Sequence, residues 1–263
     1  MGDRLKNPPV YFTIAAIQHN RLAAIADYMP KVQDAFRKEG WTGYDVVQPT
    51  KIEFAMGEQK IVGEGEPQWM VYNTERTAAY IFGHEVFAFQ TTDYHDKDKF
   101  FEDFRRGLDI LHKVVGLAET RRVGMRMLDA IRPKKGEAIS DYVHSSLLSF
   151  PEALAGSELT PLKGYIEHEF SGPDCLVVTR LVRLNGALAL PVDLASVPFT
   201  LPARIDASIE GPYSVLDVDS GTLPGTVRPF REQDVMEELK LHKKNLTTVF
   251  AMTTTAHARA SWN

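Results

Sequence analysis

The chain has 263 residues, of which 44% are hydrophobic and 25% are charged, and its formal net charge is −5. These values are ordinary for a folded domain, and the acidic balance argues against a general affinity for nucleic acid backbones. The single cysteine, Cys175, excludes an intrachain disulfide framework and argues against a structural zinc site of the thiolate type. We expect a cytoplasmic protein without a membrane anchor, because no signal-peptide core opens the sequence and no apolar run reaches the roughly 20 residues that span a bilayer.

The first part of the chain predicts a strand, a helix, a group of strands and a longer helix. The stretch 10–18 is apolar on both faces, as in a strand inside a sheet. Apolar residues recur at helical spacing over 22–36, where Pro30 implies a kink or a helix that begins near it. A wide apolar stripe from Phe100 to Val115, ended by Gly116, predicts the long helix. Between the two helices we expect strands over 51–56, 68–73 and 78–91, the last with a bend or turn at Gly83–His84.

The remaining chain resumes the same order. A strand over 119–133 leads into a short helix that contains Tyr142 and Leu148 and is capped by Ser140 or Asp141. The apolar stripe of a final helix, over 232–250, matches that of the first long helix at one constant offset. Between these helices, strands are expected over 164–170, 175–184, 187–190 and 213–219.

We therefore predict an α+β fold in which one β-α-β-β-β-α unit is used twice. Amphipathic helices share a period of 3.6 residues, so the matching order of elements supports duplication more strongly than the matching stripes. The predicted parts are a first half over 1–117, a second half over 118–253 and a polar C-terminal tail over 254–263. The strands form either two antiparallel sheets or one continuous curved sheet, with the long helices on one face. We expect the indole of Trp262 to dock the tail on a neighbouring surface or on a second subunit.

The strand "ETRRVGMRMLDAI" supplies the first candidate site residues. Because side chains alternate along a strand, Val123, Met125 and Met127 share one face, while Arg122 and Arg126 share the other. In the corresponding strand of the second half, Asp217 and Asp219 leave one face about 7 Å apart. Arg122, Arg126, Asp217 and Asp219 are therefore candidate ligand or partner contacts.

These four residues allow three arrangements. The arginines can pair with the aspartates of the same chain, which satisfies the requirement that buried charges be paired. They can instead contact an anion or a partner, or the two carboxylates can share a hard cation. His242, which follows Leu241 in the final helix, joins the candidate contacts because it could lie where helix meets sheet, although a packed, hydrogen-bonded histidine is the ordinary interpretation.

Motifs for catalysis are missing from the sequence. There is no Gly-x-Ser-x-Gly elbow and no closely spaced histidine pair, and "GEGEP" at 63–67 has acidic residues where a phosphate loop needs free amides and a lysine. We therefore predict no catalytic residues, no metal and no cofactor, and lean towards a protein that is not an enzyme.

The segments "RRVGMRMLDAI", "LDVD" and "LHKKNLTTVFAMTTT" together resemble a sporadically distributed, uncharacterised prokaryotic family of roughly this length. The resemblance maps an aliphatic-Gly-aliphatic-Arg strand onto Val123–Arg126, an aliphatic-Asp pattern onto Leu216–Asp219, and a Leu-His pair onto Leu241–His242. Met127 and Asp129 depart from the family's pattern, in which an aromatic residue and an asparagine are expected. The resemblance implies a fold and a patchy distribution typical of accessory or defence-associated genes, but no reaction.

Three functional hypotheses follow. The first is a non-enzymatic binding or protein-interaction module that forms a homodimer or binds another protein. The alternative is a sensor or enzyme for a small anion or nucleotide, with Arg122, Arg126, Asp217 and Asp219 as contacts. The third is a saddle for nucleic acid, which the net charge disfavours.

Overall fold

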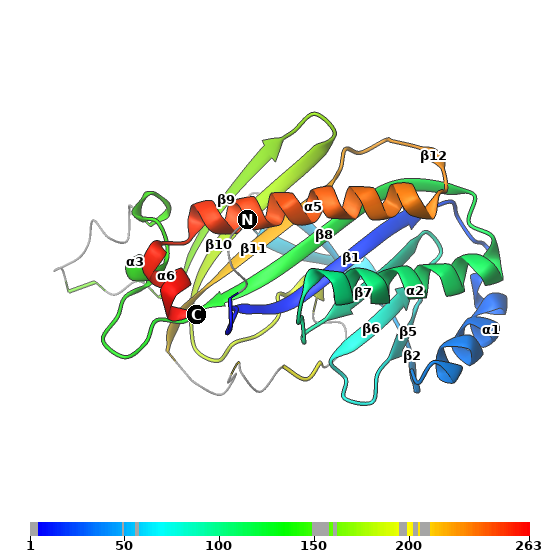
Figure 1. Ribbon diagram of the computed structural model, residues 1–263, viewed down its shortest axis with the longest axis horizontal. Coiled ribbons are helices and arrows are strands. Elements are labelled where there is room, and N and C mark those ends of the chain that lie inside the picture. Colours follow the sequence, from blue (N-terminus) through cyan, green and yellow to red (C-terminus); the bar gives the residue numbers. More distant parts are fainter. Residues whose placement is uncertain are drawn as a thin grey trace.

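The computed structural model describes residues 5–48, 50–55, 58–148, 158–159, 162–194, 199–201, 205 and 211–263. Mixed helices and strands form an α+β fold around a ten-stranded antiparallel sheet that does not close (Figure 1). Within these ranges, no helix is long and apolar enough to cross a membrane.

The strands run in chain order as β1 Val10–His19, β2 Gly43–Val47, β3 Thr50–Ala55, β4 Glu58–Glu64, β5 Gln68–Tyr72, β6 Ala78–Phe82, β7 Val86–Thr91, β8 Glu119–Ile131, β9 Gly164–Ser171, β10 Cys175–Asn185, β11 Pro212–Thr222 and β12 Arg228–Pro229. The helices are α1 Ile25–Lys38, α2 Lys97–Val115, α3 Ile139–Tyr142, α5 Glu232–Thr253 and α6 Ala256–Ser261, with 3₁₀ turns η1 Ser145–Leu147 and η2 Val192–Leu194.

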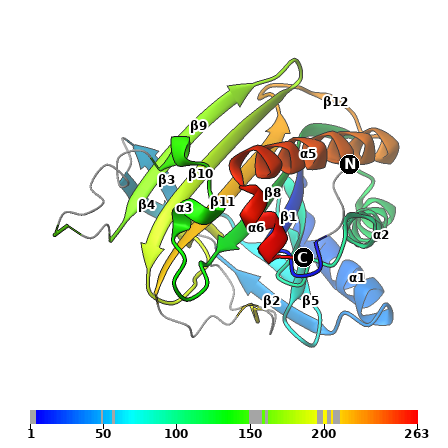
Figure 2. The same ribbon diagram turned by 60° about the vertical axis from the view of Figure 1, so that its left-hand side comes forward.

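The main sheet has the strand order β2-β5-β6-β7-β1-β8-β11-β10-β9, and β12 pairs with β8. Strands β1 and β8 lie side by side at the centre, in register from Ala16 opposite Gly124 to Thr13 opposite Met127. This pairing joins the two parts of the chain in one continuous sheet. The β3–β4 hairpin forms a separate two-stranded sheet that projects on the side away from the helices (Figure 2).

The three long helices cover one face of the main sheet (Figure 2). Helix α5 packs on β8 and β11, α2 packs on β7, and α1 packs beside α2. Helix α2 begins at Asp96, whose carboxylate accepts a hydrogen bond from the Lys99 amide at 2.9 Å, and it ends at Gly116 with φ +67°. The end at Gly116 agrees with the sequence prediction.

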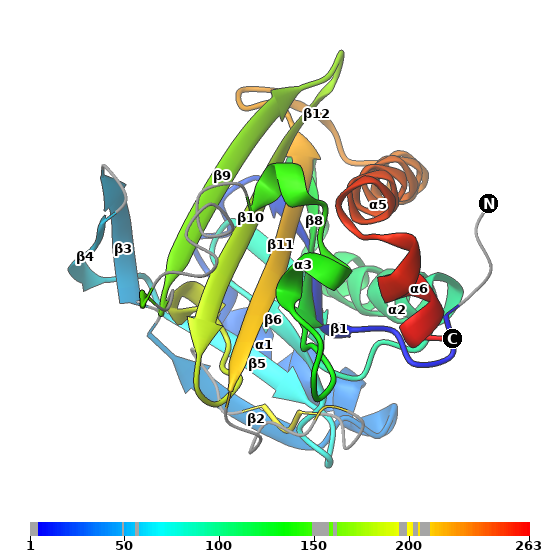
Figure 3. The same ribbon diagram turned by 90° about the vertical axis from the view of Figure 1, so that its left-hand side faces the viewer.

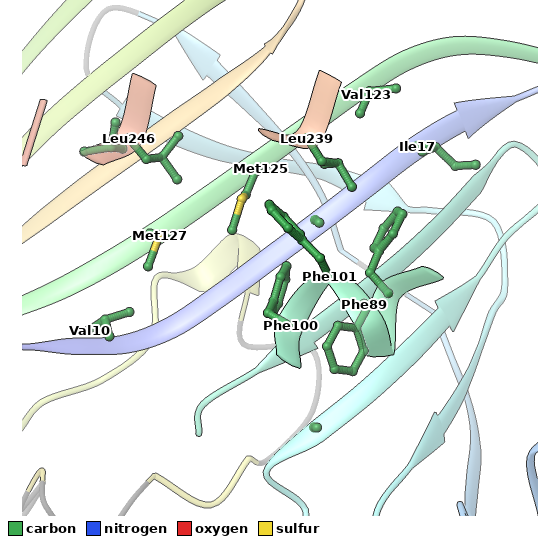
Figure 4. Close-up of a cluster of buried hydrophobic side chains, with 14 of the residues drawn as sticks. Val10, Ile17, Phe89, Phe100, Phe101, Val123, Met125, Met127, Leu239 and Leu246 are labelled. Carbon is green, nitrogen blue, oxygen red and sulfur yellow. The ribbon is translucent and has the colours of Figure 1, made fainter. Parts of the chain in front are cut away.

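The core lies between these helices and the sheet. Figure 4 shows Val123 and Met125 of β8 gathered with Leu239 of α5 and Phe101 of α2. The Phe104 side chain is fully buried in the same cluster. Because a buried phenylalanine leaves a cavity when it is truncated, Phe104→Ala should lower the free energy of unfolding by about 3–5 kcal/mol.

Two predictions in the second half are wrong. The short helix is broken, because Val143 forms a β-bridge with Thr254 between α3 and η1, and Asp141 accepts a hydrogen bond from the Ala138 amide instead of preceding the helix. The stretch 187–190 is not a strand, since the chain leaves the sheet at Gly186, where φ is +125°.

The first half also differs in detail. Strand β2 was not predicted, and α1 begins at Ile25, so Pro30 lies inside it. The expected turn at Gly83 is confirmed, because its amide donates to the Val86 carbonyl at 2.8 Å and separates β6 from β7.

The C-terminal residues dock on their own chain. They form α6, and the Trp262 ring lies with its centroid 5.7 Å from that of Phe250 and 5.9 Å from that of Tyr142. The Asn7 amide donates to the Trp262 carbonyl at 2.8 Å and ties the early chain to this end. The expected docking of Trp262 is therefore confirmed.

Candidate functional site

The candidate residues of β8 and β11 meet on the sheet face that the long helices leave open. In β8, Val123, Met125 and Met127 point into the helix-covered core, as predicted (Figure 4). Arg122 and Arg126 therefore leave the opposite face. Strand β11 pairs with β8 and sets Asp219 opposite Arg126 and Gly221 opposite Gly124. We call this surface, defined by Arg122, Gly124, Arg126, Asp217 and Asp219, the arginine face.

Arg126 and Asp217 form a closed, buried ion pair. The guanidinium donates from Nε to Oδ1 and from Nη2 to Oδ2 of Asp217, both at 2.7 Å, and a third donor, Nη1, bonds Asp193. The Arg126 side chain is 14% exposed and that of Asp217 is 4% exposed. Arg180 lies 3.6 Å from the same carboxylate. This bidentate geometry satisfies both charges within the chain, which confirms the internal ion pair expected from the sequence.

The electrostatics of Arg126 follow from this pairing. Burial alone would lower the pKa of the Arg126 guanidinium, because it disfavours the charged form. Hydrogen bonding and attraction from Asp217, with a further contribution from Asp193, outweigh burial and hold the pKa above its ordinary value. Arg126 is therefore a permanent cation that is already fully engaged.

Arg122 and Asp219 form an open pair on the same two strands. Their closest atoms, Nη2 and Oδ2, are 4.0 Å apart, and neither side chain makes a hydrogen bond within the described parts of the chain. The Arg122 side chain is 42% exposed. Burial raises the pKa of Asp219, and the attraction of Arg122 and Arg126 offsets only part of that shift. Both groups retain hydrogen-bonding capacity that the described residues do not use.

A pair of glycines shapes the surface beside Arg122. A Cβ on Gly221 would lie 3.0 Å from Nη2 and 3.1 Å from Nε of Arg122, so the guanidinium rests over the bare backbone of β11. A Cβ on Gly124 would meet only ordinary contacts, the nearest being the Ser220 carbonyl oxygen at 3.4 Å. The two glycines thus leave a trough in the sheet that Arg122 partly fills.

A depression of about 200 Å³ lies next to this trough. Its polar lining comes from Gln18, Arg122, Arg126 and Asp219, and the rest is mainly apolar. The apolar residues on its rim include Ile14, Ala16, Val86 and Leu194. Among the described residues, the arrangement presents one cation with unused donors, one carboxylate with unused acceptors and an apolar wall.

The segment that follows β10 crosses one end of the arginine face. It supplies Asp193 to Arg126 and Leu194 to the depression. The Tyr213 hydroxyl donates to the Ala187 carbonyl at 3.1 Å, and the Tyr11 hydroxyl donates to the Ala189 carbonyl at 3.3 Å. These bonds anchor the segment on β1 and β11. Asp193 was not among the residues predicted for the site, because nothing in the local sequence shows that this segment returns to the sheet.

Further along the face, β10 and β9 extend the ion-pair network. Arg180 donates to Glu167 at 2.6 Å as well as lying near Asp217. The network therefore holds three arginines (Arg122, Arg126 and Arg180) and four carboxylates (Glu167, Asp193, Asp217 and Asp219) among the described residues. Arg180 could have been found from its sequence, since it alternates with the buried Thr179 and Leu181 along a strand that the sequence predicts.

His242 does not belong to the arginine face. It lies in α5 under the opposite, helix-covered face and is fully buried. Its Nδ1 is 2.9 Å from the hydroxyl of Ser220, and that hydroxyl also accepts from Asn245 at 3.2 Å. Burial, followed by the charges of Arg122 and Arg228, lowers the pKa of His242 to about 4. His242 is therefore a neutral packing residue at physiological pH, as the ordinary interpretation of the sequence has it.

Other chemistry is sparse in the described part of the chain. No three side chains among its histidines, cysteines, aspartates and glutamates gather in a way that could hold a metal ion. Cys175 is buried, and its sulfur lies 3.4 Å from the amide nitrogen of Asn245.

Comparison with known proteins supplies no relative: no family model, no curated protein and no solved structure matches the chain.

Proposed function

We propose that this chain is a non-enzymatic binding protein whose arginine face takes a carboxylate-bearing segment of a partner protein. The observation that carries the proposal is the contrast between Arg126, whose donors bond Asp217 and Asp193, and Arg122, which is half-exposed and donates no side-chain hydrogen bond to any described residue. A carboxylate is the planar acceptor that a guanidinium binds best, because two parallel hydrogen bonds can form. Arg122 is the contact for that group.

The size of the depression favours a single side chain or chain end over a nucleotide. Pockets for cofactors and drug-sized ligands occupy roughly 300–1,000 Å³. The depression beside Arg122 holds about 200 Å³ and is open to solvent on one side. A nucleotide would lie mostly outside it, whereas one apolar side chain with an adjacent carboxylate fits its mixed lining.

The charge of the surrounding face supports the same choice. With three arginines and four carboxylates, the network has no excess of positive charge to attract a phosphate backbone. Nucleic acid binding is therefore the weakest of the three hypotheses.

The test uses N-acetyl-L-leucine, which combines an apolar side chain with a free carboxylate and lacks the competing amine. We expect its titration to shift the Arg122 Nε–H resonance and to leave that of Arg126 unchanged. N-acetyl-L-leucinamide, which lacks the carboxylate, is the matched control, and adenosine monophosphate tests the nucleotide alternative.

Two variants locate the binding. Arg122→Gln should abolish the shifts in the neighbouring backbone amides, because it removes the cation. Gly124→Leu should do the same by filling the depression, since the backbone there leaves room for a Cβ. Equal shifts from the leucinamide, or shifts that survive Gly124→Leu, would show that the arginine face is not the binding site.

We also propose that the two halves descend from one β-α-β-β-β-α unit and that the chain belongs to the sporadic prokaryotic family it resembles, as a cytoplasmic accessory or defence-associated protein. The sheet order supports duplication, because each half places its first strand beside its last long strand: β1 beside β7, and β8 beside β11. Each half also ends in a long helix on the same face. The halves differ in the helix after the first strand, which is long in α1 and only four residues long in α3.

A further inference from the structure

Strand β9 forms a long free edge of the main sheet (Figure 3). It pairs with β10 over eight residue pairs and has no strand on its other side among the described residues. Most of its side chains are exposed. The opposite edge, β2, is only five residues long. Because an edge strand presents unpaired amide and carbonyl groups, β9 is the larger of the two templates for pairing with another chain.

Exposed apolar side chains gather at this edge. Leu162, just before the strand, is 67% exposed, and Tyr165 and Phe170 within it are 51% and 54% exposed. With Leu159, they make four of the nine large exposed hydrophobic residues found in the described ranges. Apolar residues concentrated on one edge mark an interaction surface more clearly than single ones scattered over the molecule.

We propose that β9 pairs antiparallel with β9 of a second copy of this chain, about a two-fold axis that passes through Ile166. In this register Tyr165 lies opposite Glu167, Lys163 opposite Glu169, and Leu162 opposite Phe170. A two-fold contact repeats every such pair on both sides of the axis. Leu162, Tyr165 and Phe170 each thereby gain a cross-strand neighbour.

Charge selects this register. Neither the Lys163 nor the Glu169 side chain makes a hydrogen bond or an ion pair within the described parts of the chain, and the axis at Ile166 brings them together twice. An axis at Glu167 would set that glutamate opposite itself, and an axis at His168 would set Glu167 opposite Glu169. Like charges directly opposite one another destabilise a strand pair.

An axis at Tyr165 is disfavoured for a different reason. It would set Lys163 opposite Glu167, which already bonds Arg180 and the Tyr165 hydroxyl. It would also leave Glu169 without the lysine. Only the axis at Ile166 satisfies the two unpaired charges.

The resulting dimer has a defined shape and strength. An axis perpendicular to the sheet keeps the helices of both copies on one side and the two arginine faces on the other. The contact consists of the stretch 162–170 from each copy, which places it at the low end of interface sizes, below about 1,200 Å². We therefore expect a dimer that dissociates on dilution.

Disulfide trapping tests the register directly. Ile166→Cys places two thiols opposite each other across the axis, with Cβ atoms about 4.5–5.5 Å apart, so mild oxidation should give a covalent dimer. His168→Cys is the matched control on the same strand face: it lies opposite Gly164, and its thiol is about 13 Å from its copy along the strands. Cross-linking that is equal at both positions, stronger at His168, or absent at Ile166 would overturn the proposal.

Charge reversal provides a second measurement that does not depend on oxidation. Lys163→Glu and Glu169→Lys should each weaken dimerisation in sedimentation velocity by about tenfold, because each reversal acts twice across the axis. The double variant should recover the dimer. A wild type that stays monomeric over the whole concentration series, or a double variant that recovers nothing, contradicts the proposed pairing.

Discussion

The pairs Arg126–Asp217 and Arg122–Asp219 are built on the same two strands, yet they differ in almost every physical respect. The first has two hydrogen bonds at 2.7 Å and side chains that are 14% and 4% exposed. The second is separated by 4.0 Å, and its arginine is 42% exposed. Arg122 and Arg126 lie on the same face of β8, on either side of Gly124 along the strand. The charge of Arg126 is needed for the stability of the fold, whereas the charge of Arg122 is available to a ligand.

The largest effect is expected from removing Arg126. Arg126→Ala removes the bidentate partner of the buried Asp217 carboxylate and should lower the free energy of unfolding by about 3–5 kcal/mol. Arg122→Ala, measured by the same urea titration, should cost less than about 1 kcal/mol, because the exposed pair is screened by water. Similar losses for the two variants would remove the distinction between the pairs.

Replacing Arg126 and Asp217 together sharpens the comparison between the two ion pairs. Arg126→Met combined with Asp217→Leu removes both buried charges, so the double variant should regain most of the roughly 3–5 kcal/mol that Arg126→Ala loses. Denaturant titration measures the recovery. If the double variant is as unstable as Arg126→Ala, the loss comes from packing rather than from an uncompensated carboxylate.

Moving the Arg122 guanidinium should have a smaller effect on stability and a large one on binding. Gly221→Ala puts a methyl group 3.0 Å from Nη2, which forces the guanidinium off the trough. We expect weaker binding of N-acetyl-L-leucine with a loss of about 1 kcal/mol or less in stability. Gly124→Ala is the control with ordinary contacts. Equal binding by both variants would mean that the position of Arg122 over Gly221 does not matter.

The smallest expected effect is on the pKa of His242, which is about 4. The positive charge of Arg122, on the other face of the sheet, contributes to lowering it. Arg122→Gln should raise this pKa by a fraction of a pH unit, while Arg180→Gln should not, as NMR titration of the imidazole can show. The folded-state pKa is below the ordinary value of about 6.5. Stability is therefore complete above about pH 6.5 and falls as the pH drops towards 4.

The size of that pH effect is also measurable. Between pH 7 and pH 4.5, the preferential protonation of His242 in the unfolded chain should lower the free energy of unfolding by roughly 2–3 kcal/mol. This part of the pH dependence should vanish in His242→Gln. An unchanged pH profile in that variant would mean that His242 titrates normally in the folded protein.

Much of the fold and part of the site could be predicted from local patterns. The alternation of Val123 and Met125 with Arg122 and Arg126 set the two faces of β8, and the paired aspartates of β11 identified the partners of the arginines. Local periodicity could not show which arginine would be engaged. That depends on the β8–β11 register and on Asp193, which arrives from a segment 67 residues away along the chain.

The incorrect predictions have similar causes. His242 was included among the candidate contacts because it could lie where helix meets sheet, and its contact with Ser220 of β11 shows the packed alternative instead. The helix expected around Tyr142 is interrupted by the bridge from Val143 to Thr254, a contact made by the far end of the chain. In both cases a long-range contact overrides a local preference.

The most direct test is a pair of double-mutant cycles, one on Arg126 and Asp217 and one on Arg122 and Asp219, with alanine at each position and unfolding free energies as the measurement. We predict a coupling energy above about 2 kcal/mol for the first pair and below about 0.5 kcal/mol for the second. Coupling of equal size in the two cycles would contradict the account, because Arg122 would then stabilise the fold as strongly as Arg126 does.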